Sequence, residues 1–136
     1  NGEYDALRET VEGVLTLSIL LDQFPRNLYR GSPRAFATDA LALDIVKSAV
    51  ASGFDAELGK TRRMFLYLPF EHSENLENQD MSVWLFRALK DEQSYNYALE
   101  HYYVISRFSR FPGRNAALGR DSTPEELEFL KVFGAY

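Results

Sequence analysis

The sequence contains no cysteine, which excludes disulfide bonds, thiolate zinc sites and cysteine nucleophiles and fits a reducing, cytoplasmic location. No apolar run approaches the roughly 18 residues that a membrane-spanning helix needs, so we expect no membrane partner. No segment alternates apolar and polar residues as a half-buried strand does. A phosphate-binding loop, a dinucleotide fingerprint and a G-x-S-x-G nucleophile turn are also missing. These absences favour an all-α protein outside the common nucleotide-binding and serine-hydrolase classes.

An excess of positive charge is also missing, because the net charge is −5. Nucleic-acid binding depends on neutralising phosphates, so we expect no nucleic-acid partner. The basic residues are nevertheless unevenly placed. Segments 24–37 and 107–120 contain no Asp or Glu. Each segment carries several arginines: Arg26, Arg30 and Arg34 in the first, and Arg107, Arg110, Arg114 and Arg120 in the second.

Helical periodicity predicts one domain over residues 1–136, an array of antiparallel helix pairs. Prolines, glycines and capping residues set the expected ends of the helices. The predicted helices are 4–23, ending before Pro25; 38–53, opened by Thr38 and closed by Gly53; 61–68, ended by Pro69; a helix capped by Ser73 or within 78–80 and reaching about residue 90; 94–109; and a last helix that begins at Pro124 after a Ser122 or Thr123 cap.

Two similar stretches, FPRNLYRGSP at 24–33 and FPGRNAALGRDSTP at 111–124, raise the question of a shared role. Proline cannot continue a helix and favours an extended residue before it, so each Phe-Pro pair predicts a sharp helix exit. Phe24 and Phe111 would then fill the core, with arginines beside the free carbonyls of the helix ends. A carboxylate at a helix C-terminus is unfavourable, so we expect Asp22 to pair with one of these arginines.

The chain has two histidines, and both lie in informative surroundings. His72 lies between Glu71 and Glu74 just before a predicted helix, and His101 lies on the apolar stripe of the predicted 94–109 helix. One interpretation is that each is a hydrogen-bonded core residue. In the other, His72 or His101 is a general acid or base, oriented by Glu71 or Glu74. The catalytic candidates are therefore His72, His101 and Glu74. No metal-ligand spacing is present, and neither a metal nor a cofactor is expected.

Three segments together carry a family resemblance. LLDQFPRNLYRGSPRAFATDALAL, LYLPFEHSENL and HYYVISRFSRFPGRNAALGRDSTPEELEFL resemble the family known as domain of unknown function 924, which implies a tetratricopeptide-like helical fold and no particular reaction. The matching positions are Asp22, Gln23, Phe24, Pro25, Arg26, Asn27, Pro69, His72, Ser73, Glu74, His101, Arg107, Phe108, Arg110, Phe111, Pro112, Arg114 and Asn115.

Two features depart from the family pattern. Family members usually begin with a segment rich in Trp and Phe ahead of the equivalent of Gly2, so this chain is expected to be a fragment or a short form. Helix surface that the segment normally covers would be bare, which favours a homo-oligomer. Gly113 stands where the family commonly has histidine, which lowers the expectation of acid–base chemistry at the second bend.

Three functional hypotheses follow. The first is a binding module whose arginine-lined, aromatic-walled groove receives an anionic small molecule or an acidic peptide end. The second is a structural or oligomerisation domain with an internal arginine–carboxylate network. The third is an enzyme that uses His72 and His101 as acid and base. The candidate ligand-binding residues are Asp22, Gln23, Arg26, Asn27, Arg30, Arg107, Arg110, Arg114 and Asn115.

Overall fold

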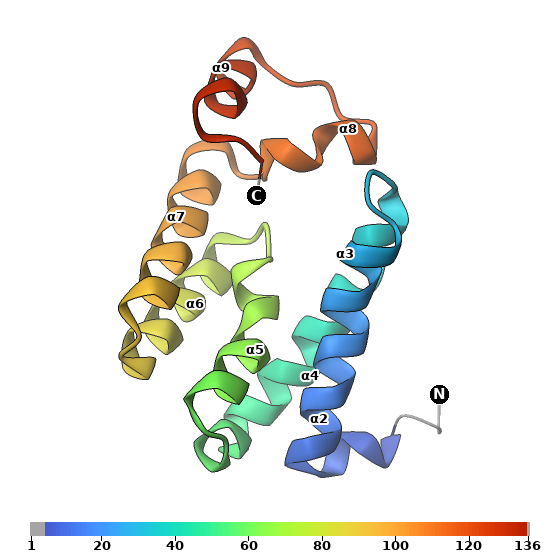
Figure 1. The fold of residues 1–136 in the computed structure, drawn as a ribbon, viewed down its shortest axis with the longest axis vertical. Coiled ribbons are helices and arrows are strands. Elements are labelled where there is room, and N and C mark those ends of the chain that lie inside the picture. Colours follow the sequence, from blue (N-terminus) through green and yellow to red (C-terminus); the bar gives the residue numbers. More distant parts are fainter. Residues whose placement is uncertain (1–4, 136) are drawn as a thin grey trace.

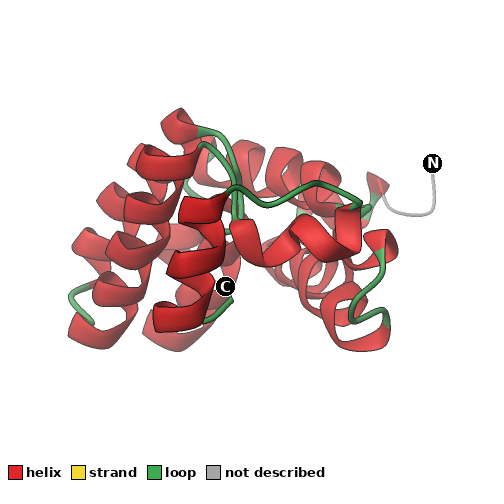
Figure 2. Ribbon diagram, turned by 90° about the horizontal axis from the view of Figure 1, so that it is seen from above, coloured by secondary structure: helices red, strands yellow, loops and turns green. Residues whose placement is uncertain are grey.

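The computed structural model describes residues 5–135, and this range is all-α with no strand (Figures 1 and 2). The predicted helix start at Tyr4 lies outside the described residues. None of the described helices has the length and apolar character needed to cross a membrane. The α-helices are α2 (Val11–Ser18), α3 (Phe24–Leu28), α4 (Asp39–Ala51), α5 (Lys60–Glu71), α6 (Leu76–Leu89), α7 (Glu92–Phe108), α8 (Asn115–Leu118) and α9 (Pro124–Phe133). Short 3₁₀ turns are η1 (Leu7–Glu9), η3 (Pro33–Phe36), η4 (Phe54–Glu57) and η5 (Pro112–Arg114), and η2 (Ile19–Gln23) is a π-helical segment.

Neighbouring helices pack against one another along the chain. The most extensive contacts join α6 to α7 and α5 to α6, and α2 packs on α4. The chain then turns across one end of the array, where α8 and α9 lie (Figure 1). A tetratricopeptide-like arrangement stays a prediction. The end of α5 and the start of α4 lie at the same end of the molecule as α8.

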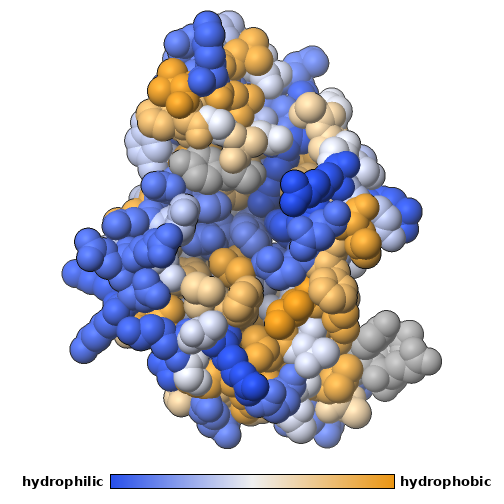
Figure 3. Space-filling view, viewed as in Figure 1, coloured by the Kyte–Doolittle hydropathy of each residue, from blue (hydrophilic) through white to orange (hydrophobic). Residues whose placement is uncertain are grey.

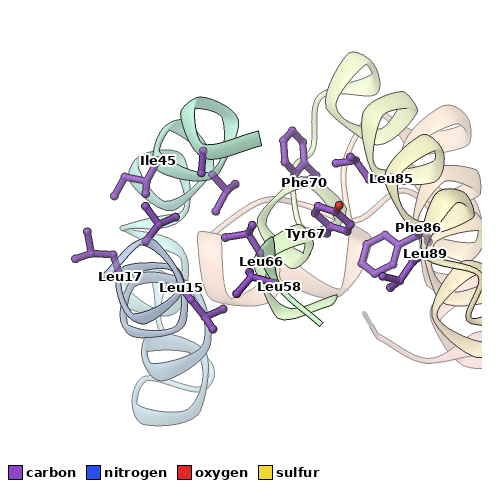
Figure 4. Close-up of a cluster of buried hydrophobic side chains, with 14 residues drawn as sticks. Leu15, Leu17, Ile45, Leu58, Leu66, Tyr67, Phe70, Leu85, Phe86 and Leu89 are labelled. Carbon is purple, nitrogen blue, oxygen red and sulfur yellow. The ribbon is translucent and has the colours of Figure 1, made fainter. Parts of the chain in front are cut away.

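Two apolar clusters hold the helices together. The larger one joins α2, α4, α5, α6 and α7, and its side chains face one another in Figure 4. Within it, the rings of Tyr67 and Phe86 meet edge to face, with centroids 5.8 Å apart. The smaller cluster contains Phe111 and Phe129 and attaches the C-terminal segment to α7. Full burial of an aromatic side chain contributes about 1.5–3 kcal/mol, so the second cluster fixes the bend at Phe111.

The predicted helix exit at Phe24–Pro25 is wrong. The helical path continues from α2 through η2 into α3, and Phe24 is helical and 50% exposed rather than buried. The N–H of Phe24 donates to the carbonyl of Ile19, a π-type bond that widens the turn before Pro25. Pro25 has no N–H for the carbonyl of Leu21, and this carbonyl instead accepts the Thr38 hydroxyl at 2.6 Å. The proline is therefore accommodated within the helix.

Three other predicted boundaries are also wrong. Helix α5 continues past Pro69 to Glu71, because Pro69 lies in its last turn and the N–H of His72 still reaches the carbonyl of Leu68 at 3.0 Å. Helix α6 is capped by Asn75 rather than by Ser73 or a residue of 78–80. Helix α7 begins at Glu92, two residues before Ser94, and its Asp91 cap accepts the Ser94 N–H.

Phe111, in the second bend, is extended (φ −90°, ψ 108°) and 1% exposed, so it fills the core as predicted. The Phe-Pro pair does not end the helix, because α7 ends earlier, at Phe108, where Ser109 is left-handed with φ 62°. The predicted features of the last helix are confirmed. Thr123 and Glu126 form a reciprocal capping box at the start of α9, with Pro124 at the first helical position. Gly53, at φ 77°, follows α4 in the left-handed conformation expected of it.

Surface hydropathy divides the face shown in Figure 3 into zones. Polar surface crosses its middle, between apolar surface over α9 at one end and further apolar surface at the other. The exposed apolar residues of α9 include Leu127, Val132 and Phe133. Self-association through such surface stays a prediction.

Candidate functional site

Asp22 is the centre of a buried polar network. The wide η2 turn places this carboxylate inside the protein, where it is 1% exposed. It accepts hydrogen bonds from His72 Nδ1 at 2.8 Å, from the Gln23 amide at 2.7 Å and from Arg26 at 3.1 Å. Burial raises the pKa of Asp22, but the bonds from His72 and Gln23 and the charge of Arg26 outweigh it, and the pKa lies below its usual 3.8. Asp22 is therefore an ionised carboxylate, and the expected pairing with an arginine is present.

Asp39, in the first turn of α4, lies between Arg26 of α3 and Arg114 of the bend at Phe111. Arg26 binds both of its carboxylate oxygens, at 2.7 and 2.8 Å. Arg114 lies farther from it, with Nη1 3.9 Å from the same carboxylate. Both guanidinium groups also lie over the ring of Phe36, at 5.4 Å for Arg26 and 4.7 Å for Arg114. Guanidinium groups from sequence-distant segments therefore meet at one carboxylate.

Arg114 is the less completely paired of these two cations. Its side chain is 8% exposed and lies over Phe111 as well as Phe36, 4.6 Å from the Phe111 centroid. One Nη donates to the carbonyl of His72 at 2.8 Å, but the buried Nε–H has no acceptor among the described residues. Burial, reinforced by the charge of Arg26, lowers the pKa of Arg114 to about 10. The positive charge of Arg114 is thus incompletely compensated.

A cavity of ≈380 Å³ opens beside Arg114. Its walls combine apolar and polar side chains: Phe36, Ala40, Leu43, Pro69 and Leu118 on one hand, and Asp39, His72, Ser73, Glu74 and Arg114 on the other. Another hollow, of ≈450 Å³, lies along the first turns of α7 and is lined by acidic and amide residues with Tyr97. That hollow contains neither histidine and no motif arginine, so the cavity beside Arg114 is the candidate site.

An ion pair between Glu74 and Arg120 stabilises the second bend, at residues 109–115. Glu74 binds Arg120 through two bonds of 2.9 and 3.0 Å and accepts the backbone N–H of Phe111 at 2.6 Å. Arg120 also donates to the Asn115 side chain at 2.9 Å. Glu74 reaches the cavity wall, but its oxygens already have donors. Its pairing ties the loop before α6 to the bend at Phe111.

Arg110 has a similar structural partner. It binds both oxygens of Glu126, at 2.8 and 2.7 Å, and the carbonyl of Asp121 at 2.7 Å. The Arg110 bond and the capping bond from Thr123 lower the pKa of Glu126 to about 2, against a smaller opposing effect of burial. Asn115 is buried and donates to Ser122 at 3.1 Å. These residues hold α9 against the bend and lie away from the cavity wall.

The two histidines are neighbours with different surroundings. Their ring centroids are 6.3 Å apart, but only His72 lines the cavity. The carbonyl of Tyr97 accepts His101 Nδ1–H at 2.7 Å, and the ring lies edge-on to Phe111, 5.5 Å away. Burial lowers the pKa of His101 to about 4. The predicted orientation of His72 by Glu71 or Glu74 is wrong, since Asp22 holds its Nδ1.

Glu71 is a buried acid at the C-terminal end of α5. It is 5% exposed, and its nearest ionisable partner is His101, with Oε2 4.0 Å from Nε2. Burial, together with the negative charges of Asp22 and Glu100, raises the pKa of Glu71 to about 8. Glu71 is therefore a neutral carboxylic acid at pH 7.

Of the nine predicted ligand residues, only Arg114 lines the cavity. Asn27 and Arg30 are exposed at the end of α3 and beyond it. Arg107 lies on the exposed side of α7, where it stacks over Phe108 at 4.7 Å and donates to the Tyr103 hydroxyl at 3.2 Å. Asp22 and Arg26 do not line the cavity, but they bind the lining residues His72 and Asp39. Gln23 donates to Asp22 in the same network.

Sequence reasoning did not select Asp39 and Phe36, although both line the site. Their position supplied a signal, because Asp39 is the first acid after the 24–37 positive island and follows the predicted Thr38 cap. An acid in the first turn of a helix has a structural explanation of its own, favoured by the helix dipole. The separate role of Asp39 becomes visible only from its contacts.

These observations define a class: an all-α protein whose cavity is lined by charged residues from three separate segments. The chain belongs to DUF924, a family of bacterial proteins of unknown function, and the family model matches residues 1–134. A solved structure described as a protein of unknown function, ATU0120 from Agrobacterium tumefaciens, is similar, with 40% identity and a TM-score of 0.91. The match covers 96% of this chain and 73% of that one. No curated protein matched the sequence.

Proposed function

We propose that this domain binds a small molecule carrying a carboxylate or phosphate group, with the anionic oxygens at Arg114. The observation that carries the proposal is the incomplete pairing of Arg114, a buried cation that lines a cavity and has one donor without an acceptor in the part of the chain that the structure describes. Burying a charge is costly unless it is paired, and an anion in the cavity would relieve this cost. Guanidinium groups bind carboxylate and phosphate oxygens well because several N–H donors lie in one plane.

The other charged residues of the wall are already paired. Asp39 binds Arg26 through both oxygens, and Glu74 binds Arg120 in the same way. Arg26 therefore acts mainly by orienting Asp39, while Arg114 remains to meet the ligand. The volume of ≈380 Å³ is typical of a small-molecule site and favours a small anion over an acidic peptide end. The apolar half of the wall favours a ligand with an apolar part.

Thermal unfolding in the presence of phosphate, acetate and citrate, at constant ionic strength, tests this function. A ligand at 100 times its Kd stabilises the folded state by about 2.7 kcal/mol, a shift of several degrees for a domain of this size. We expect this shift in the wild type and its loss in Arg114→Gln, because the variant lacks the anion's main partner. Each variant is compared with its own anion-free melting temperature, so a change in basal stability does not affect the result.

Arg34→Gln is the matched control, since it removes the same charge from an exposed arginine that stacks on Tyr29. Arg114→Lys keeps the charge but loses the planar fork and is expected to respond weakly. An equal anion response in wild type and Arg114→Gln would reject the proposal. It would favour the alternative in which the charges only lock helix ends together. A cytoplasmic location and self-association are further proposals that these measurements leave aside.

A further inference from the structure

We infer that the Asp22–His72 pair makes the cavity a hydrolytic site for small carboxylic esters, with His72 Nε2 as the general base and Arg114 as the oxyanion partner. This inference rests on the proposed function, because it uses the same cavity and the same guanidinium group. It adds a reaction to binding, and the carboxylate released by the reaction belongs to the class of anions proposed for Arg114.

The hydrogen bond between Asp22 and His72 fixes which nitrogen carries the proton. An ionised carboxylate only accepts hydrogen bonds, so the 2.8 Å contact requires a proton on His72 Nδ1. In the neutral ring, Nε2 then carries the lone pair. A carboxylate that holds Nδ1–H also stabilises the imidazolium formed when Nε2 takes a proton, which is the role of aspartate in catalytic triads.

Burial keeps His72 in the neutral, basic form near pH 7. It lowers the pKa of the ring below 6.5, and the hydrogen bond and charge of Asp22 offset only part of this effect. Arg26 and Arg114 lower the pKa further. The neighbouring His101 ring is held by the Tyr97 carbonyl and contributes no lining to the cavity. His72 is therefore the imidazole that a bound molecule meets.

Arg114 lies next to His72, since its Nη2 donates to the backbone carbonyl of that residue at 2.8 Å. Because His72 and Arg114 also both line the cavity, a carbonyl compound bound there can meet both residues. Ser73 also lines the cavity, but its hydroxyl oxygen accepts from the Asn75 N–H at 3.2 Å and the Asn78 amide at 2.9 Å. These bonds direct Ser73 towards α6, so a water molecule is the nucleophile.

The reaction then balances without a further reagent. Water gives a proton to His72 Nε2 while its oxygen bonds to the ester carbonyl carbon, and the carbonyl electron pair moves to the oxygen beside Arg114. When this intermediate collapses, the bond between the carbonyl carbon and the alkoxy oxygen breaks. The departing oxygen takes the proton from Nε2, which yields an alcohol and a carboxylic acid and restores the neutral imidazole.

Hydrolysis of p-nitrophenyl acetate by the purified protein tests the inference. We expect a protein-dependent rate that falls by at least about 100-fold in His72→Gln, the lower end of the usual contribution of a general base. Asp22→Asn acts through positioning and is expected to shift the pH–rate profile as well as lower the rate. Arg34→Gln, at an exposed position, is expected to retain the wild-type rate.

The phosphate-dependent thermal shift separates the failure of this inference from the failure of the proposed function. We expect His72→Gln to keep a phosphate response while it loses hydrolysis, because Arg114 is intact. A wild-type rate equal to that of buffer, or an equal rate in folded His72→Gln, would overturn the catalytic inference even if phosphate binds. Loss of the phosphate response in the wild type as well would remove the binding proposal with it.

Discussion

Replacing Asp22 by alanine is expected to lower the free energy of unfolding by about 3–5 kcal/mol, the usual cost of removing one partner from a buried ion pair. The side chain is 1% exposed and serves three donors, on His72, Gln23 and Arg26. Arg26 keeps Asp39 as a partner, but the donors on His72 and Gln23 lose their acceptor inside the protein. Urea unfolding at pH 7 measures this effect.

The pH dependence identifies the charge of Asp22 as the cause. Its pKa is lower in the folded protein than in the unfolded chain, so its stabilising contribution is present above the ordinary value of 3.8 and disappears as the pH falls through the folded pKa. The difference between wild type and Asp22→Ala should therefore shrink in acid. Asp44→Ala is the control, because Asp44 pairs with Arg8 at the surface and is 67% exposed. We expect a change below about 1 kcal/mol there, and an equally small change in Asp22→Ala would contradict the central position of Asp22.

Unlike Asp22→Ala, the Glu71→Gln substitution is expected to raise the free energy of unfolding, and so to stabilise the protein, at pH 8 and above. The pKa of Glu71 rises from 4.5 in the unfolded chain to about 8 in the folded protein. Folding therefore becomes less favourable as the pH rises from 4.5 towards 8, by roughly 3–5 kcal/mol at about 1.4 kcal/mol per pKa unit. Glutamine keeps the shape of the neutral acid and does not ionise, so the variant avoids this loss.

Chemical unfolding across pH 4–9 measures the effect of Glu71. The two proteins should be nearly equal near pH 4 and diverge as the pH rises, with the variant more stable. Glu128→Gln, at an exposed position of α9, is the control and should follow the wild type throughout. If the stability curves of wild type and Glu71→Gln run parallel, the pKa of Glu71 is not raised in the folded protein, and the prediction is contradicted.

Local signals in the sequence predicted most of the helices and their clearest ends. The capping box at Thr123 and the left-handed Gly53 are determined by neighbouring residues, and the structure contains both. The helix ends predicted at Pro25 and Pro69 are wrong, because each proline lies within a helix at a position where its missing N–H is tolerated. At Pro25 the orphaned carbonyl is satisfied by Thr38, 17 residues along the chain, and no local pattern contains this contact.

The candidate site was predictable only in part, for a related reason. Arginine-rich segments directed attention to Arg26 and Arg114, but which arginines face the cavity depends on helical phase and on distant partners. Arg107 follows the buried Ile105 by two residues, which places it on the other side of α7, and it is exposed. Helical periodicity carried this information. The shared use of Asp39 by Arg26 and Arg114 depends on the packing of the bends and could not be read from local sequence.

We propose that Arg114 holds an anion, and nuclear magnetic resonance of the arginine side chains tests this proposal most directly. The Nε–H resonance of Arg114, assigned by its absence from Arg114→Lys, is followed while phosphate is added to ¹⁵N-labelled protein at constant ionic strength. We predict a saturable shift of this resonance with little change at the exposed Arg34. An unmoved Arg114 resonance at phosphate concentrations that shift other arginines would contradict the account.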